Sequence, residues 1–242
     1  KINLPGYKPT FEGHKLQINK AAKAINEAQR PLLYVGGGAI ISGAQAEIKE
    51  MVEKAKIPIT TTLMALGIYP EDQPLALEML GMHGTQYANK ATLETDLVIA
   101  VGARFDDRVT GKLEEFVSQA DIIQIDIDPA EIGKNVDVEV PIVGDVKKVL
   151  GELLPYIEEK ENGPWQERIK ELKQKYPLKY DDDGSETIKP QYIMEEIDKY
   201  TKGDATIVTE VGQHQMWAAQ YHKYKKPRQF ITSGGLGTMG YG

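Results

Sequence analysis

The sequence contains no cysteine, which excludes disulfides, thiolate metal sites, iron–sulfur clusters and a cysteine nucleophile. It also has no signal peptide and no apolar run of the ~20 residues that a membrane span needs. Basic residues are scattered, and the formal net charge is -7. Neither nucleic acid nor an anionic membrane is therefore an expected partner. We predict a cytoplasmic protein, and the four histidines lack the spacing of metal ligands.

Apolar strands that alternate with helices are the main structural signal. The apolar pattern predicts strands near 32–35, 57–62, 96–102, 122–128, 140–143 and 205–209. Between them it predicts helices over 15–29, from a Ser42 cap to 55, 146–159 and 190–200. This alternation is typical of an α/β fold: an open parallel sheet with helices on both faces, Rossmann-like, followed by an incomplete second α/β unit.

Composition shifts divide the chain into four expected parts. Residues 1–13 resemble a linker, 14–160 a central domain, 161–186 a charged surface helix and linker, and 187–242 the start of a second domain. The first residues do not look like a natural initiation site, and the last ten form a glycine-rich loop. We therefore expect the chain to be a segment of a longer protein.

Glycines and polar residues follow several of the predicted strands, where ligands of open α/β sheets gather. Gly36, Gly37 and Gly38 could cradle a diphosphate or form a tight turn, and the two interpretations are about equally supported. The nicotinamide-type G-x-G-x-x-G fingerprint is absent. The lone His83 in the next glycine-containing segment is by itself more typical of a structural histidine.

The segment 102–108 is the most informative, because two arginines and two aspartates directly follow a buried strand. A surface salt-bridge cluster is one interpretation. Binding of a phosphate or carboxylate is favoured, since an aspartate can hold the guanidinium fork in place. Asp126 and Asp128 at the end of one strand, and Asp145 at the end of the next, suit ribose or ribityl hydroxyls.

Taken in order, five segments closely resemble the catalytic large subunits of acetohydroxyacid (acetolactate) synthases. The similarity extends from Pro31 to Gly242, and its specific parts are residues 61–67, 79–84, 102–109, 211–217 and 232–242. In that family the middle domain binds FAD and the third domain binds thiamine diphosphate through Mg²⁺. One such segment would be a weak signal, whereas five in order are a strong one.

The resemblance implies a set of site residues. The implied FAD contacts are Gly36, Gly37, Gly38, Thr62, Leu63, Met64, Gly81, Met82, His83, Gly84, Gly102, Arg104, Asp106, Val109, Asp126, Ile127, Asp145 and Val146. Arg108 would face the carboxylate of the second 2-oxoacid substrate. Gly212, Gln213 and His214 would lie on the diphosphate side of the thiamine site, and Met239 would hold thiamine in its bent form.

The implied reaction decarboxylates pyruvate and joins the two-carbon unit to pyruvate or 2-oxobutyrate, in branched-chain amino-acid biosynthesis. Family members work as homodimers or tetramers, often with a regulatory small subunit. The family's activating glutamate and its Mg²⁺-binding motif do not appear in this sequence. We therefore expect no catalytic residue and no metal ligand in this chain, and no activity from the chain alone.

Other interpretations remain open at this point. A flavin-free catabolic acetolactate synthase or a pyruvate oxidase has a similar architecture, although the segment 104–108 favours the flavin-dependent branch. A non-catalytic dinucleotide-binding module would explain the first 160 residues and leave 211–217 and 233–242 unexplained. A purely structural interaction domain would not explain the polar strand ends.

Overall fold

The computed structural model describes residues 8–111, 116–117, 119–181, 184 and 187–242. Most of the expected N-terminal linker, and Asp182 and Asp183 of the second expected linker, lie outside the described residues. Six parallel strands form the main sheet in the order β3-β2-β1-β4-β5-β6. They are β1 (Pro31–Val35), β2 (Ile59–Thr61), β3 (Ala76–Met79), β4 (Leu97–Val101), β5 (Asp121–Asp126) and β6 (Val140–Val143). The predicted open parallel sheet is confirmed.

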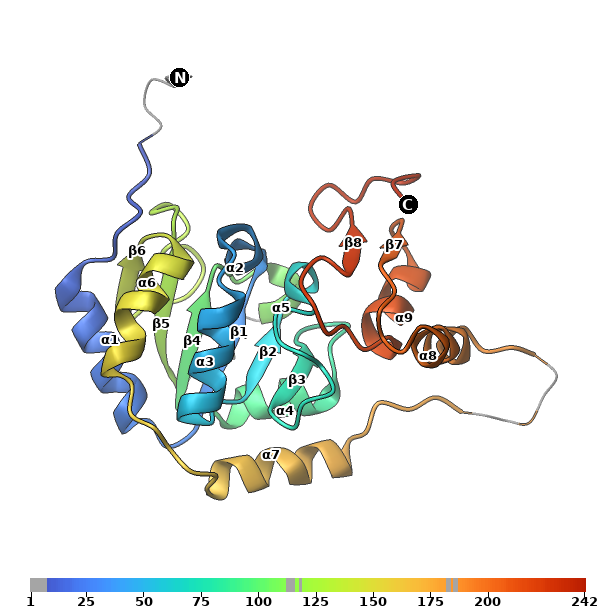
Figure 1. The fold of residues 1–242 in the computed structure, drawn as a ribbon, viewed down its shortest axis with the longest axis horizontal. Helices are drawn as coiled ribbons and strands as arrows, with labels where there is room; N and C mark the ends of the chain where they lie inside the picture. Colours follow the sequence, from blue (N-terminus) through green and yellow to red (C-terminus); the bar gives the residue numbers. More distant parts are fainter. Residues whose placement is uncertain (1–7, 112–115, 118, 182–183, 185–186) are drawn as a thin grey trace.

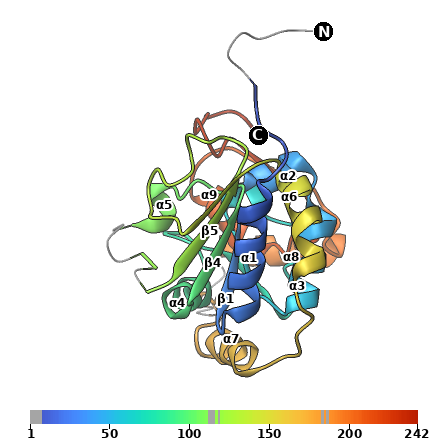
Figure 2. The same cartoon turned by 90° about the vertical axis from the view of Figure 1, so that its left-hand side faces the viewer.

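Helices cover both faces of this sheet (Figures 1 and 2). On one face lie α1 (Lys15–Glu27), α2 (Gly37–Ser42), α3 (Gln45–Ala55) and α6 (Val146–Leu153), and on the other α4 (Gln86–Glu94) and α5 (Asp107–Thr110). Strand β1 contributes side chains to the hydrophobic cores on both faces of the sheet. Leu33 and Val35 belong to the core of the first face, whereas Leu32 and Tyr34 belong to the two clusters opposite. The alternation follows from the period of two in a strand.

Helix α7 (Pro164–Lys175) runs below the sheet in Figure 1 and packs against α4. The sequence predicted a charged surface helix here, but one side of α7 is buried. Trp165, Ile169 and Leu172 join Leu32 and Leu77 in a common core, and the indole Nε1 donates a hydrogen bond to the Pro31 carbonyl at 2.9 Å. These three apolar residues recur at helical spacing, a signal that the charged composition obscured.

The predicted cap at Ser42 is wrong, although a helix does end at Ala55 as predicted. Two helices occupy this segment: α2 ends at Ser42, Gly43 turns the chain with a φ of 70°, and α3 begins at Gln45. The Ser42 hydroxyl instead donates to Asp145 at 3.1 Å and accepts from the Lys147 amide at 2.8 Å. It therefore ties α2 to the start of α6.

Other boundaries also differ from the prediction. Strand β5 ends at Asp126, so Asp128 lies beyond it, and the helix expected over 146–159 becomes α6 followed by a 3-10 turn, η2 (Leu154–Tyr156). Strand β3, helix α4 and the 3-10 turn η1 (Leu63–Ala65) had not been predicted. The register between β2 and β3 shifts inside β3, which leaves little period-two pattern to detect.

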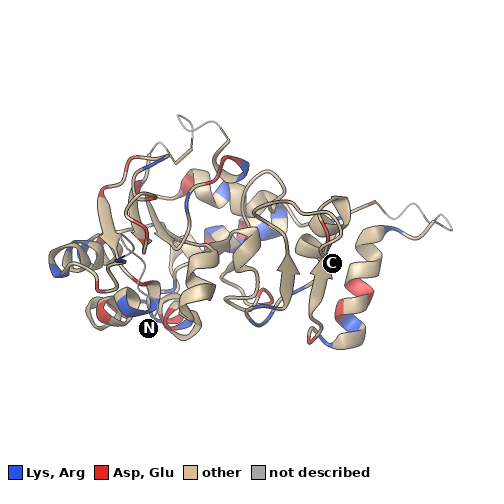
Figure 3. Cartoon of the chain, turned by 90° about the horizontal axis from the view of Figure 1, so that it is seen from above, with Lys and Arg blue, Asp and Glu red and all other residues tan. Residues whose placement is uncertain are grey.

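The second unit contains a parallel pair of strands, β7 (Ile207–Thr209) and β8 (Phe230–Thr232), with α8 (Pro190–Thr201) and α9 (Gln213–Tyr221). It lies beside the β3 end of the main sheet (Figure 1). Leu66 and Met79 of the central unit share one buried cluster with Ala218, Ala219, Tyr224 and Phe230. Both signs of charge are interspersed along the elements (Figure 3), and no described helix is long and apolar enough to cross a membrane.

Candidate functional site

The carboxyl ends of the parallel strands lie along one edge of the main sheet, the upper edge in Figure 1. Backbone hydrogen bonds continue past the strands here. Gly36 N donates to Val101 O, Thr62 N to Val35 O, and Gly102 N to Ile125 O, at 2.8–2.9 Å. The segments predicted to contact FAD are thus brought together. We call this region, formed by residues 36–38, 61–64, 80–84, 102–109, 126–127 and 144–146, the strand-end edge.

Glycines at this edge allow two turns to pack directly against each other. A Cβ on Gly36 would overlap the Gly102 carbonyl oxygen, and one on Gly38 would lie 2.9 Å from Gly102 Cα. Gly102 itself has a φ of +58°, which favours glycine. Gly38 N donates to Gly102 O at 3.1 Å, so this amide is already paired. Close packing of the turns explains Gly36, Gly38 and Gly102, while Gly37 faces Met64.

Two hydroxyls at the end of β2 have no partner among the described residues. The Oγ1 atoms of Thr61 and Thr62 are both buried and make no hydrogen bond, whereas Thr60 Oγ1 donates to Glu78 O at 2.8 Å. Buried hydroxyls in native proteins are normally hydrogen-bonded. The unpaired pair at the strand-end edge is therefore what a polar ligand would satisfy.

The turn after β3 is held by a residue that the sequence did not reveal. Asn89 of α4 accepts from Gly81 N at 2.9 Å and donates to Gly81 O at 3.0 Å. Gly81 has a φ of +105°, and Met82 N donates to Arg108 O at 2.9 Å. Asn89 is half-buried within a helix that had not been predicted, so no motif marked it.

The charged segment after β4 is ordered around Asp106. Its side chain caps α5 by accepting from Arg108 N at 3.2 Å and pairs with the Arg104 guanidinium at 2.9 Å. Burial alone would raise the pKa of Asp106, but the Arg108 amide and both guanidinium groups lower it overall. Arg108 is exposed, and its side chain makes no ion pair with a described residue. Arg104 is thus held by an ion pair, whereas the Arg108 guanidinium has no ion-pair partner among the described residues.

Phe105 sits between these arginines in a strained conformation. It is buried with a φ of +52°, and Asn135 Nδ2 donates to the carbonyls of both Arg104 and Phe105, at 3.2 and 3.0 Å. A non-glycine residue at positive φ costs free energy and persists where its surroundings hold it. Neither Asn135 nor Gln124, which donates to Ala103 O at 3.4 Å, had been predicted to support the segment.

The strand-end carboxylates are partly engaged by their own backbone. Asp145 accepts from Ser42 and from the Lys148 amide, which caps α6. Asp126 accepts from the Asp128 amide at 2.9 Å, and burial raises its pKa despite that hydrogen bond. Asp128 in turn accepts from Ala130 N at 2.9 Å. One oxygen of each carboxylate is therefore committed to the fold.

Some residues implied as FAD contacts contribute apolar packing. Val146 is buried in the main core, Val109 packs against the cluster around Phe105, and Leu63 packs against the cluster shared with the second unit. The Val146 side chain points into protein, so a ligand could use only its backbone. Met82 and Met64 are exposed, at 65% and 47%.

The thiamine residues implied by the resemblance lie at the end of β7. Gly212 precedes α9, and Gln213 and His214 open that helix, as the sequence predicted. The His214 ring folds back over Gly212, since a Cβ there would lie 3.1 Å from its Cε1 and Nδ1. Met239 is 67% exposed in the loop that follows β8.

The two sets of implied cofactor residues meet between the units. Gln220 Nε2 of α9 donates to His83 O at 2.7 Å. A Cβ on Gly234 would overlap the sulfur of Met64, so the loop after β8 touches the strand-end edge directly. The arrangement places the strand-end edge beside α9 and the loop after β8.

The cavities only partly coincide with this edge. A cavity of about 370 Å³ borders it and is lined by Leu80, Asn89, Val109 and Thr110, among others. A larger one of about 580 Å³ lies elsewhere, between the end of α3, the segment before β3 and α7, where Lys56, Tyr69 and Lys173 line it. Among the described residues no group of three or more His, Asp or Glu could hold a metal ion.

Comparison with known proteins identifies the family. The model of the central domain of thiamine pyrophosphate (thiamine diphosphate) enzymes matches residues 18–153, more than half of the chain. The chain belongs to the thiamine pyrophosphate enzymes. The model of their C-terminal, thiamine pyrophosphate-binding domain matches residues 210–242. Both matches agree with the two units of the structure.

Relatives of this thiamine pyrophosphate enzyme confirm the resemblance to acetolactate synthase large subunits. The whole chain is 53% identical to a probable acetolactate synthase large subunit of Methanocaldococcus jannaschii and covers 42% of it. It is 49% identical to the acetolactate synthase large subunit of Corynebacterium glutamicum, covering 39%, and 48% identical to acetolactate synthase 1, chloroplastic, of Zea mays, covering 39%. The chain spans about two fifths of the length of these relatives.

Proposed function

We propose that this chain supplies the flavin-binding edge and part of the thiamine site of an acetolactate synthase. Such an enzyme decarboxylates pyruvate and joins the two-carbon unit to pyruvate or 2-oxobutyrate in branched-chain amino-acid biosynthesis. The observation that carries the proposal is an identity of about half over the entire chain to proteins of that name. The contact between the strand-end edge and the loop after β8 supports it, because it places the two ligand regions side by side.

FAD would be held along the strand-end edge. The Thr62 hydroxyl and the Asp126 carboxylate offer hydrogen bonds to ribityl or ribose hydroxyls, and Arg104, fixed by Asp106, offers a guanidinium to the diphosphate. Gly37 and the Gly81–Gly84 turn pack against atoms of this chain, so these glycines would shape the edge that faces the cofactor. FAD supplies no redox step to this reaction and would serve as a structural element. The paired amide of Gly38 argues against a diphosphate bound at that amide.

The thiamine part of the site would use fewer residues of this chain. Thiamine diphosphate with Mg²⁺ would supply the electron sink for decarboxylation. Gln213 and His214, at the start of α9, would face the diphosphate. The exposed Met239 would support the bent cofactor with its apolar side chain. Arg108 would bind and orient the carboxylate of the second 2-oxoacid.

The proposal also covers the domain boundaries, the cellular location and the assembly of the protein. We place the flavin domain at 14–160 and the start of the thiamine domain at 187–242, in a cytoplasmic homodimer or tetramer with a regulatory small subunit. The free side chain of Arg108 and the exposed Met239 support an assembly in which further protein covers these groups. Light scattering of a protein of the relatives' length tests the oligomeric state.

Flavin binding is tested by titrating the chain with FAD and following flavin fluorescence. Thr62→Val removes the unpaired hydroxyl at nearly constant shape and should weaken binding about tenfold, the value of one hydrogen bond to a ligand. Thr10→Val, at an exposed position, is the matched control and should bind FAD like the wild type. If the wild-type chain bound no FAD, the proposed flavin site would be contradicted, and a flavin-free thiamine enzyme would be the remaining interpretation.

The reaction is tested in a protein of the relatives' length that carries this chain. Arg108→Lys should raise the KM for the second 2-oxoacid and slow carboligation more than decarboxylation, because the planar fork is lost while the charge is kept. Equal losses of rate in carboligation and decarboxylation would contradict a role for Arg108 in binding the second 2-oxoacid. The 242-residue chain by itself should form no acetolactate, and steady turnover by it would contradict our assignment of the activating groups.

A further inference from the structure

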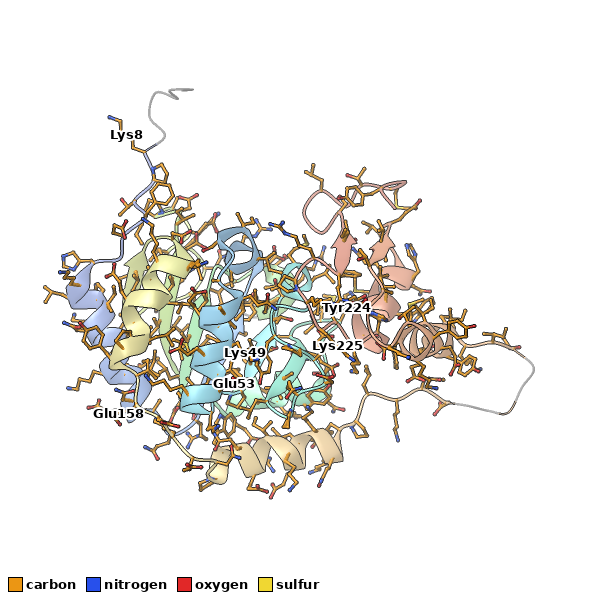
Figure 4. The ribbon with its side chains drawn as sticks, in the orientation of Figure 1. Lys8, Lys49, Glu53, Glu158, Tyr224 and Lys225 are labelled. Carbon is orange, nitrogen blue, oxygen red and sulfur yellow. The ribbon has the colours of Figure 1, made fainter. Side chains whose placement is uncertain are left out.

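Two buried carboxylates lie where the central unit meets the second unit. Glu71, in the segment before β3, is 5% exposed, and Glu78, within β3, is 6% exposed. Both face the segment 222–225 that follows α9. Figure 4 labels Tyr224 and Lys225 at this junction. Carboxylates are seldom fully buried unless they are paired, so this junction requires an explanation.

The contacts bind the two units at several points. Glu71 N donates to Tyr224 O at 3.0 Å, and Glu71 Oε2 accepts from Tyr224 N at 2.9 Å. Glu78 Oε1 forms an ion pair with Lys223. A Cβ on Gly67 would overlap the Lys226 carbonyl oxygen, so the two segments are in direct contact. The junction is built around the two carboxylates.

Each carboxylate nevertheless has one oxygen without a partner. Glu71 Oε1 and Glu78 Oε2 are buried and have no hydrogen-bond partner of good geometry among the described residues, although Tyr87 of α4 lies close to the Glu78 carboxylate. Burial raises the pKa of Glu71 well above its ordinary value, the negative charge of Glu78 raises it further, and the Tyr224 amide and Lys223 only partly offset this. The two groups are therefore close enough to repel each other when both are ionised.

The positive charges near Glu71 and Glu78 do not fully compensate the two carboxylates. Lys223 pairs with Glu78, but its side chain is 34% exposed. Lys173 of α7 faces Glu78, yet its ammonium donates to the carbonyls of Pro74 and Ala76, at 3.4 and 3.0 Å. Burial lowers the pKa of Lys173, so this charge is itself unfavourable here. Asp198 of α8 adds a further negative charge near Glu71.

The backbone of Glu78 shows that the fold holds it in place. Its φ is +61°, a conformation that L-residues rarely adopt, at the point where the register between β2 and β3 shifts. Thr60 Oγ1 fixes its carbonyl at 2.8 Å. Such a conformation persists only where surrounding contacts hold it in place.

We propose that the Glu71 carboxyl carries a proton while the second unit is docked, and that this proton makes the junction a pH-sensitive latch. The proton removes a buried negative charge beside Glu78 and turns the unpaired Glu71 Oε1 into a donor. Separation of the units exposes Glu71 to water, where the proton is released. Docking of the second unit thus takes up a proton, and the inference is independent of which cofactors bind.

The sign of the pH dependence follows from the raised pKa. A carboxyl protonated in the docked state contributes stability that is complete below its ordinary pKa of 4.5 and is lost as pH rises through the raised value. His222, fully buried with both ring nitrogens unpaired and 3.5 Å from Asp198, acts in the opposite direction. Burial lowers its pKa, so it weakens docking only below its ordinary 6.5. Above that value His222 no longer opposes the carboxyl effect.

Hydrogen exchange of the whole chain, corrected for intrinsic rates, measures the docking at pH 6.5 and about 8.5. Peptides covering α9 and the segment 222–225 should open more readily at the higher pH, by up to about tenfold per pH unit, while β1 and β4 change less. Glu71→Gln keeps an acceptor for the Tyr224 amide and removes the titration. It should abolish this pH dependence and protect α9 at the higher pH.

The control and the contrary outcomes are equally specific. Glu50→Gln, at an exposed position of α3, removes the same charge and should behave like the wild type. A wild-type junction that opens equally at both pH values overturns the proposal. So does a Glu71→Gln variant with less protection than the wild type at both values, because the junction would then require an ionised carboxylate. Carbon-13 NMR of the Glu71 carboxyl should also show that it ionises well above its ordinary 4.5, and ionisation near 4.5 overturns the latch.

Discussion

At the scale of single residues, close backbone packing determines the strand-end edge before any ligand is considered. The turns after β1 and β4 touch through Gly36, Gly38 and Gly102, and a side chain at any of these positions would meet backbone atoms that cannot rotate away. Steric overlap of this kind forces backbone shifts rather than rotamer changes. The shape of the strand-end edge therefore depends on the absence of a Cβ at these three positions.

Gly36→Ala should destabilise the chain by about 3 kcal/mol, because the new Cβ would collide with the Gly102 carbonyl. Gly151→Ala is the matched control. Gly151 lies in α6, and no atom would come within 4 Å of its Cβ. There the change should stabilise by about 0.5–1 kcal/mol through helix propensity. Urea unfolding followed by circular dichroism measures both, and equal midpoints would show that the turns can separate without cost.

A second prediction at this scale concerns Asn89. Asn89→Ala removes two hydrogen bonds and leaves the Gly81 amide unpaired, while the Gly81 carbonyl keeps its bond from Gly84 N. The change should cost about 1–3 kcal/mol. Asn26 makes an equivalent double contact at a different place, donating to Tyr156 O and accepting from Glu158 N. Asn26→Ala should therefore destabilise similarly. Only Asn89→Ala should also weaken FAD binding, and equal affinities in the two variants would show that the turn after β3 takes no part in it.

Site residues that directly follow a strand could be predicted from the sequence. The residues whose side chains hold those segments in place could not. Gly36, Gly102 and Asp106 follow recognisable apolar runs, and the structure brings them to one edge. Asn89 and Asn135 act through long-range hydrogen bonds to backbone groups, which leave no local pattern. Gln124 did carry a signal, since a polar side chain inside a buried strand requires a partner.

At the scale of elements, helix formation followed apolar spacing where that spacing was uninterrupted. Helix α1 and helix α8 lie within one or two residues of their predicted bounds. Ser42 misled the prediction because serine is a common helix cap, whereas Gly43 at positive φ separates two helices here. Strand β3 was not predicted because it is short and its register with β2 shifts at a strained residue, Glu78.

Helix α7 offers a test of how a charged helix is anchored. Trp165→Phe keeps most of the buried area but loses the hydrogen bond to Pro31, and should cost about 1–2 kcal/mol. Trp165→Ala should cost about 3–5 kcal/mol, because a large cavity opens in the core beneath β1. Trp217→Phe, at a half-buried position of α9, is the control and should change stability by less. A Trp165→Phe variant as stable as the wild type would show that the indole N–H is satisfied equally well by water.

At the scale of the whole molecule, two units share one apolar cluster and one charged junction. The cluster draws Leu66 from the central unit and Tyr224 and Phe230 from the second. The junction adds the contacts of Glu71 and Glu78 beside it. The same interface sets the strand-end edge against the loop after β8. Docking of the second unit and the geometry of the proposed ligand region are therefore physically linked.

Leu66→Ala should loosen this interface before the rest of the fold. Removing the buried side chain should cost about 2–4 kcal/mol, and the loss falls on contacts between the units. Hydrogen exchange should therefore increase in α9 and β8 while β1 and β4 remain protected, as expected for a local opening. Leu150→Ala, in the core between α6 and the sheet, removes an equal side chain and should increase exchange in β4 and β5 as well. If Leu66→Ala also exposes β4 to the same extent, the two units unfold as one, and docking of the second unit is inseparable from folding of the sheet.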